Sequence, residues 1–191
     1  MRYVVFDLET QNTFADVESN DPKDLSISVG CAYDSLTNEY TTVAIDELQK
    51  LWPIIEKADV LVGYNSDHFD IPLLNKYYPG DLTKMKSIDI MSSIRESLGR
   101  RLKLDSVAQA TVGTKKAGNG LMAIKWWREG DIASIKKYCK QDVKVTKEIF
   151  EYALTNHKVF YKEGSKKLEI PLNTSNWTAE ADRSTTFSLP F

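Results

Sequence analysis

Residues 3–10 read Tyr-Val-Val-Phe-Asp-Leu-Glu-Thr, and this stretch decides the fold. A short run rich in Val and aromatic residues favours a buried β-strand over residues 2–8. Side chains alternate between the two faces of a strand, so Asp7 and Glu9 share one face at its end. Two neighbouring carboxylates beside a core are costly unless a cation or water relieves them. The pair is therefore either a metal site or a strand that ends in solvent.

The residues that follow extend this strand into a sheet. Residues 26–33 carry apolar side chains with the two-residue period of a strand, and residues 39–45 form a third strand. The turn at residues 34–38 is short and polar, so it joins these two strands as a hairpin. A polar loop, residues 11–25, separates the first strand from the second. The opening of the chain therefore predicts an antiparallel meander.

The middle of the chain predicts a parallel addition to this meander. Apolar residues at helical spacing follow Asp46, a candidate helix cap, and lead to an apolar strand at residues 60–64. The order strand, helix, strand places that strand parallel to an earlier one. A second helix is expected after Asp70, because Pro72 is tolerated in a first turn. Residues 88–90 mark a fifth, short strand.

The second half of the chain is mainly helical. A glycine-rich stretch at residues 113–120 interrupts it, and a hairpin around Gly164 follows. The order of strands and then helices indicates an α/β or α+β domain over residues 1–172, with a polar tail at residues 173–191. The expected helices are 91–98, 104–112 and 131–154, and the hairpin strands are 157–162 and 167–172.

Length and composition limit the class of protein. The 191 residues are 42% hydrophobic and 27% charged, which suits one compact domain and excludes a long disordered chain. The sequence has neither an apolar run long enough to span a membrane nor the pattern of a secretory signal, so we expect a soluble, cytoplasmic protein with no membrane partner. Cys31 and Cys139 are too few for a disulfide framework and are expected to be buried thiols.

The net charge of −2 conceals an asymmetry along the chain. Residues 1–94 carry 7 Lys and Arg against 16 Asp and Glu, whereas residues 95–147 carry 13 against 5. The basic segment is either a set of solvated helix faces or a track for a polyanion such as nucleic acid.

Two further segments supply acidic side chains. Residues 64–72 read Tyr-Asn-Ser-Asp-His-Phe-Asp-Ile-Pro and contain Asp67 and Asp70. Taken alone, Asp70 also fits an ordinary helix cap, and Asp67 a loop residue. In residues 138–142, Tyr-Cys-Lys-Gln-Asp, a spacing of four places the first and last side chains on one helical face.

In this order and on these elements, the segments resemble the DEDD superfamily of 3'-5' exonucleases, which have a ribonuclease H-like fold. The resemblance spans about residues 1–155. It implies an α/β fold with a mixed five-stranded sheet flanked by helices, to which this chain adds a small C-terminal hairpin and tail. The three motifs of the family are similar to residues 6–10, 63–70 and 138–143.

The third motif indicates the branch of that superfamily. Tyr138 lies four residues before Asp142, which is similar to the DEDDy branch of polymerase proofreading domains and ribonuclease D. The other branch has a histidine five residues before the aspartate, where this chain has Lys137. The family's second motif starts with Asn and ends with Phe-Asp, which matches Asn65 and favours Asp70 over its neighbour Asp67.

The resemblance implies a two-metal phosphodiester hydrolysis. Two Mg²⁺ or Mn²⁺ ions, roughly 4 Å apart, activate water and stabilise the departing 3' oxygen. Asp7 would bridge the ions, Glu9 could also accept a hydrogen bond from the terminal 3'-OH, and a neutral Tyr138 would orient the water. The expected metal ligands are Asp7, Glu9, Asp70 and Asp142.

The implied substrate is nucleic acid with a single-stranded 3' end, with DNA favoured. Basic side chains before the helix at residues 104–112 and within the glycine-rich stretch suit backbone phosphates. The expected substrate-binding residues are Thr10, Asn65, Arg100, Arg101, Lys103, Lys115 and Lys116.

Alternatives remain open at this point. The chain could be a non-catalytic nucleic-acid-binding module, although such a module would be expected to lack one of the four acids, or a ribonuclease H-like endonuclease. Trp126 and Trp127 could stack on bases, although packing is expected for at least one of them. His68 is expected to be a solvated or structural side chain, and Asp89 a helix cap.

A polymerase, helicase or sliding-clamp partner would have to act in trans. Residues 186–191 are similar to short bacterial clamp-binding peptides, without their usual leading Gln. The alternative is that the apolar end, Phe187 to Phe191, folds back onto the domain.

Overall fold

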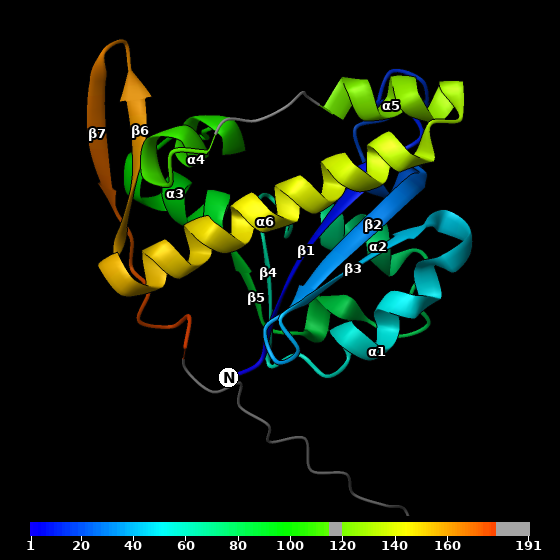
Figure 1. The fold of residues 1–191 in the computed structure, drawn as a ribbon, viewed down its shortest axis with the longest axis horizontal. Helices are drawn as coiled ribbons and strands as arrows, with labels where there is room; N and C mark the ends of the chain where they lie inside the picture. Colours follow the sequence, from blue (N-terminus) through cyan, green and yellow to red (C-terminus); the bar gives the residue numbers. More distant parts are fainter. Residues whose placement is uncertain (115–119, 179–191) are drawn as a thin grey trace, which may run out of the picture.

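The computed structural model describes residues 1–114 and 120–178. A five-stranded sheet lies between helices on both faces, and a two-stranded hairpin packs against helices α3, α4 and α6 (Figure 1). The order of strands across the sheet is β3-β2-β1-β4-β5. This arrangement confirms the mixed α/β class. The strands are β1 (Tyr3–Thr10), β2 (Ile27–Asp34), β3 (Glu39–Ala44), β4 (Val60–Gly63) and β5 (Ser87–Asp89).

The pairing of the strands places β1 in the middle of the sheet. It runs antiparallel to β2, which continues antiparallel to β3, so the predicted meander is confirmed. On its other side β1 runs parallel to β4, and β4 runs parallel to β5. The register between β1 and β2 shifts at Glu9 and Thr10, where the strand ends. Such an irregularity re-aims side chains, and here it lies beside the acidic pair.

Helices cover both faces of the sheet (Figure 1). The long helix α6 crosses one face and packs on β1 and β2. No helix in the described ranges is both long and apolar enough to span a bilayer. The α-helices are α1 (Trp52–Ile55), α2 (Asp70–Asn75), α3 (Ile90–Leu98), α4 (Leu104–Thr111), α5 (Gly120–Glu129) and α6 (Ile132–Asn156).

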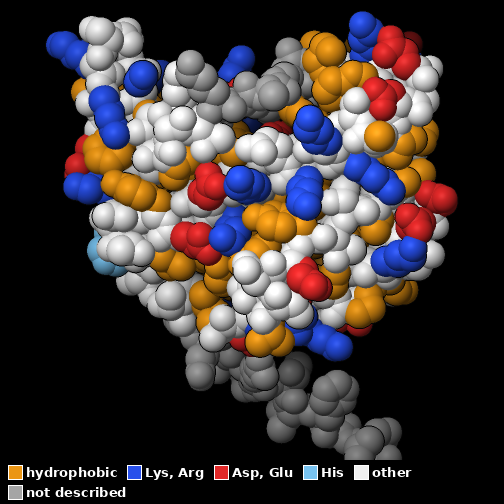
Figure 2. Space-filling model, in the orientation of Figure 1, with side chains coloured by type: hydrophobic (Ala, Val, Ile, Leu, Met, Phe, Trp, Pro, Cys, Tyr) orange, Lys and Arg blue, Asp and Glu red, His pale blue; other side chains and the backbone are white. Residues whose placement is uncertain are grey.

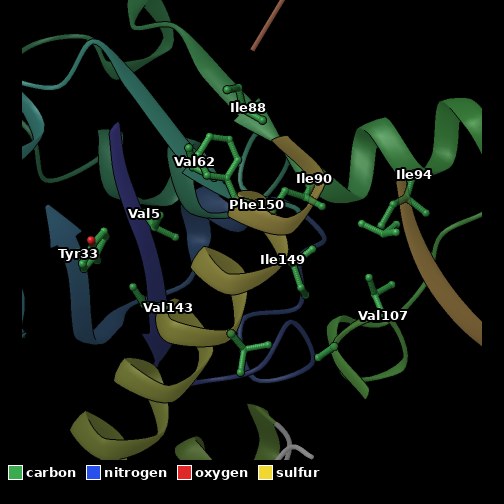
Figure 3. Close-up of a cluster of buried hydrophobic side chains, with 14 of the residues drawn as sticks. Val5, Tyr33, Val62, Ile88, Ile90, Ile94, Val107, Val143, Ile149 and Phe150 are labelled. Atoms are coloured by element: carbon green, nitrogen blue, oxygen red, sulfur yellow. The ribbon is translucent and has the colours of Figure 1, made fainter. Parts of the chain in front are cut away.

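Two apolar clusters, one on each face, hold the layers together. Val143, Ile149 and Phe150 of α6 pack in the same cluster as Val5 of β1 and Val62 of β4 (Figure 3). The opposite faces of these strands pack against α1 and α2. All eight residues of β2 are buried, because β2 lies between two strands and beneath both layers. Strand β1, which carries Asp7 and Glu9, is thus held in position from both faces of the sheet.

Two local elements differ from expectation. The segment after β3 is a 3-10 helix, η2 (Ile45–Leu51), followed by the short α1. Asp46 does not cap it, since the capping position belongs to Ala44 and no side chain bonds there. Pro53 has no N–H to donate to the preceding turn, so η2 and α1 do not join into one continuous α-helix. Helix α5 lies between the expected helices at residues 104–112 and 131–154, and it was not predicted from the sequence.

The C-terminal hairpin consists of β6 (Lys158–Glu163) and β7 (Lys166–Pro171). Trp177, inside the tail expected to be polar, is buried and stacks on Phe150 with ring centroids 5.5 Å apart. Thr174 is also buried, and its hydroxyl lies 2.6 Å from Nδ1 of His157. The first residues after the hairpin therefore pack on the domain. The apolar end at residues 187–191 lies outside the described residues.

Candidate active site

One cavity, of ≈ 560 Å³, receives side chains from all three sequence segments. Strand β1 ends at it, α2 begins at it, and one side of α6 faces it. The four predicted metal ligands and the tyrosine all line this cavity: Asp7, Glu9, Asp70, Tyr138 and Asp142. The fold therefore brings together side chains that are far apart in the sequence.

Asp7 and Glu9 form the centre of the acidic cluster. A carboxylate oxygen of each lies within 4.8 Å of the other and of the Cys139 sulfur. The Cys139 thiol donates a hydrogen bond to the main-chain oxygen of Asp7 at 3.3 Å. Burial raises the pKa of Cys139 well above its usual value, so the sulfur stays protonated. The oxygens of the carboxylates are therefore the donors available to a cation here.

Asp70 is buried at the first turn of α2. It does not cap this helix, because the capping position belongs to Phe69 and has no side-chain bond. Its Oδ1 accepts the backbone N–H of Leu8 at 3.1 Å, which ties α2 to β1. Burial raises the pKa of Asp70 to about 7, against the opposing effect of this hydrogen bond. A bound cation would favour the charged form and offset the cost of burying it.

Tyr138 lies one helical turn before Asp142, and the two side chains are hydrogen-bonded. Burial, followed by the charges of Asp142, Glu9 and Asp7, raises the pKa of the phenol, so it stays neutral. The ring of Trp126 packs edge-on against that of Tyr138 at 6.0 Å. At least one of the paired tryptophans thus packs, as expected, and it holds the tyrosine ring in place.

Asp67 and His68 lie outside the cavity. Both side chains are exposed, and Asp67 accepts a hydrogen bond from the Ser87 hydroxyl at 2.6 Å. The structure therefore brings Asp70, and not Asp67, to the other carboxylates.

The predicted substrate-binding residues divide into three groups. Thr10, Asn65 and Lys103 line the main cavity. Lys103 and Asn65 also line a neighbouring cavity of ≈ 570 Å³, together with Arg101. Arg100 lines neither of these two cavities, because it pairs with Glu163 at 3.0 Å and lies over the Tyr161 ring. Lys115 and Lys116 fall outside the described residues.

An apolar wall of the cavity was not foreseen. Phe14, from the loop expected to be polar, meets Phe69 edge-on with ring centroids 6.1 Å apart. Leu121 of α5 lines the same cavity and is 67% exposed. Arg128 of α5 pairs with Asp16 of the loop at 3.1 Å, which links the two elements. The apolar residues of this loop, Phe14 with Val17 and Leu25, were the available signal.

Most of the basic residues on α6 do not form an open track. Figure 2 shows basic side chains interspersed with acidic ones on the face that α6 crosses. Lys147 pairs with Glu151 at 3.1 Å, and Lys144 lies 4.0 Å from Glu148. Neutralised pairs of this kind fit a solvated helix face. Among the described residues, the basic side chains that line the two cavities are Arg101 and Lys103, before α4.

Comparison with known families agrees with this architecture. A family model described as the RNase H superfamily matches residues 4–155, which is most of the chain. The chain belongs to the RNase H superfamily. No curated protein sequence matches this superfamily member. The residues that line the acidic cavity all lie within this matched range.

A solved structure of a relative of this fold is that of the family B DNA polymerase from the hyperthermophilic archaeon Pyrobaculum calidifontis. Its similarity to this RNase H superfamily member has a TM-score of 0.63 at 18% sequence identity. The match covers 81% of this chain and 24% of the polymerase chain. At this identity the similarity is evidence for the fold.

Proposed function

We propose that this RNase H superfamily protein is a metal-dependent 3'-5' exonuclease of the DEDDy type. One observation carries the proposal: four carboxylates and a neutral tyrosine, from three distant segments, line one cavity. A non-catalytic module has no need to keep four acidic side chains at one site, where their mutual repulsion destabilises the fold. The DNA polymerase among its structural relatives favours DNA as the substrate.

The donor set fits hard divalent cations. Asp7, Glu9, Asp70 and Asp142 offer only carboxylate oxygens, the ligands that Mg²⁺ and Mn²⁺ prefer. These residues would hold two ions, which when bound supply an activated water and charge stabilisation for the leaving oxygen.

The remaining groups of the site orient the reactants. Tyr138 keeps its proton, so its hydroxyl can hold the attacking water by a hydrogen bond while Asp142 fixes the phenol. Glu9 would also accept a hydrogen bond from the terminal 3'-OH, which explains a requirement for a strand end.

The shape of the site favours a single strand. The apolar wall formed by Phe14, Phe69 and Leu121 suits the face of a base that has left its duplex. Lys103 and Arg101 line the neighbouring cavity, where they would neutralise phosphates of the preceding nucleotides. These contacts read no base edge, so we expect little sequence preference.

A digestion panel tests the proposed function. Single-stranded DNA, duplex DNA and RNA, each labelled at the 5' end, are incubated with Mg²⁺, Mn²⁺ or EDTA. We expect a ladder that shortens from the 3' end of single-stranded DNA, with release of mononucleotides and no reaction in EDTA. Cleavage of circular single-stranded DNA would instead identify an endonuclease. Binding without hydrolysis under every metal condition would identify a non-catalytic module.

A further inference from the structure

Asp89 makes more hydrogen bonds than a helix cap requires. It ends β5, is 4% exposed, and caps α3 through the backbone N–H groups of Met91 at 2.9 Å and Ser92 at 3.2 Å. The same carboxylate accepts the N–H groups of Asn65 at 2.8 Å and Asp67 at 3.3 Å. A carboxylate has about four lone-pair sites, and this one bonds four backbone donors. Half of these bonds hold the turn after β4, not the helix.

The turn that Asp89 holds contains a residue with positive φ. Asn65 has φ of 67°, in the left-handed region that asparagine adopts more readily than most other residues apart from glycine. Its side chain lines both cavities, and within the described residues its Oδ1 is buried without a hydrogen-bond partner. The Oδ1 atom of Asn65 therefore makes no hydrogen bond that stabilises the turn, whereas the main-chain N–H of Asn65 bonds Asp89.

The turn also leads directly into α2. The oxygen of Asn65 accepts the N–H of Phe69 at 3.0 Å, and that of Ser66 accepts the N–H of Ile71 at 2.8 Å. Ser66 is buried against Gly63, where a Cβ would overlap its side chain. The turn is thus packed on one side and bonded to Asp89 on the other.

We infer that Asp89 is a positioning residue, which holds the turn at residues 65–67 so that the Asn65 carboxamide faces the terminal nucleotide. This inference rests on the proposed exonuclease function. The Oδ1 atom of Asn65, which has no partner within the described residues, would then accept a hydrogen bond from the substrate. Asp89 acts through Asn65 and does not itself line either of the two cavities at this site.

Two substitutions separate positioning from capping. Serine and asparagine are both good N-caps, so Asp89→Ser and Asp89→Asn each preserve the start of α3. Asparagine keeps an Oδ1 for the bonds that this atom makes to Asn65, Met91 and Ser92. Serine is one atom shorter and cannot reach the turn.

The expected result is a change in substrate binding. Asp89→Ser should raise KM for a single-stranded oligonucleotide about tenfold, with kcat changed less than about threefold. Asp89→Asn should stay within about twofold of the parent KM. Amide hydrogen exchange at residues 65 and 67 should accelerate in Asp89→Ser, a readout that needs no activity. Ile94→Val, which removes a buried methyl group from α3, is the control for a simple loss of stability.

A third variant tests the inference even if Asp89→Ser does not fold. Asn65→Gly tolerates the left-handed turn but lacks the carboxamide, so it should raise KM as Asp89→Ser does. An unchanged KM in Asn65→Gly, or unchanged exchange at residue 65 in Asp89→Ser, would overturn the inference. If the parent protein hydrolyses no nucleic acid, the proposed function fails, and the exchange measurement still decides whether Asp89 holds the turn.

Discussion

Asp70 and Leu8 are joined by a hydrogen bond from the backbone of β1 to the buried carboxylate of α2, at 3.1 Å. This bond places Asp70 beside the strand that carries Asp7 and Glu9. It favours the charged carboxylate, yet burial outweighs it and leaves the pKa near 7. Without a bound cation, the burial of a charged Asp70 therefore lowers the free energy of unfolding.

Stability without metal should depend on pH through Asp70. Its pKa is about 7 in the folded protein against an ordinary 3.8, so the folded state holds the proton more tightly. Stability therefore falls as pH rises from about 4 to about 7, by up to about 4 kcal/mol at about 1.4 kcal/mol per pKa unit. Asp70→Asn should remove this loss and melt higher than the parent at pH 8. Thermal unfolding in EDTA between pH 4 and pH 8 measures it. A difference between variant and parent that does not change with pH would contradict this assignment.

Removal of a metal ligand should abolish hydrolysis without unfolding the domain. We expect Asp7→Asn and Asp142→Asn to lower kcat/KM by at least about 1000-fold, because each neutralises a cation ligand. Their melting temperatures in EDTA should equal or exceed that of the parent, since repulsion among carboxylates falls. Asp67→Asn is the matched control and should retain activity within about threefold. Activity of Asp7→Asn within tenfold of the parent would refute the site.

The hydroxyl of Tyr138 should affect kcat and not metal affinity. Tyr138→Phe keeps the ring that packs on Trp126 and deletes the hydroxyl that we propose orients water. A loss in kcat of roughly 10- to 1000-fold is expected, with Mn²⁺ affinity nearly unchanged by calorimetry. Tyr152→Phe, on the same helix but packed on Phe160, should behave as the parent. Equal rates for the two variants would make Tyr138 a packing residue.

The basic residues before α4 should differ in their contribution to binding. Lys103→Gln should raise KM and reduce the slope of log KM against log salt by about 0.7, the value for one phosphate contact on a single strand. Arg101→Gln should act in the same direction. Arg100→Gln should leave both quantities unchanged, because its guanidinium pairs with Glu163. A titration from 50 to 300 mM KCl, roughly the range over which such contacts weaken, distinguishes the three.

Local sequence was sufficient for the features that depend on periodicity. The acidic pair of β1 and the helical spacing of Tyr138 and Asp142 follow from strand and helix geometry, and the structure places them in one cavity. The partner of Arg100 is 63 residues away, so a basic cluster in the sequence could not reveal that one member is engaged. The hydrogen bonds of Asp89 to the turn are also long-range, and only the cap was foreseen.

The cavity wall was missed for a related reason. Phe14 belongs to a mainly polar loop, and its apolar contact is with Phe69, which is 55 residues away in the sequence. Helix α5 supplies Leu121 to the same wall, and only two of its residues, Ala123 and Ile124, are buried to mark its helical period. Phe14 and α5 line the cavity because the fold brings distant segments together, and their local composition does not indicate this.

The position of α6 late in the chain has a consequence for how the protein matures. This helix supplies the last two residues of the site, and it also closes the core over β1 and β2. A nascent or proteolysed chain that stops before α6 has neither. The proposed site is therefore complete only once α6 has packed on the sheet, so the proposed hydrolysis requires the folded domain.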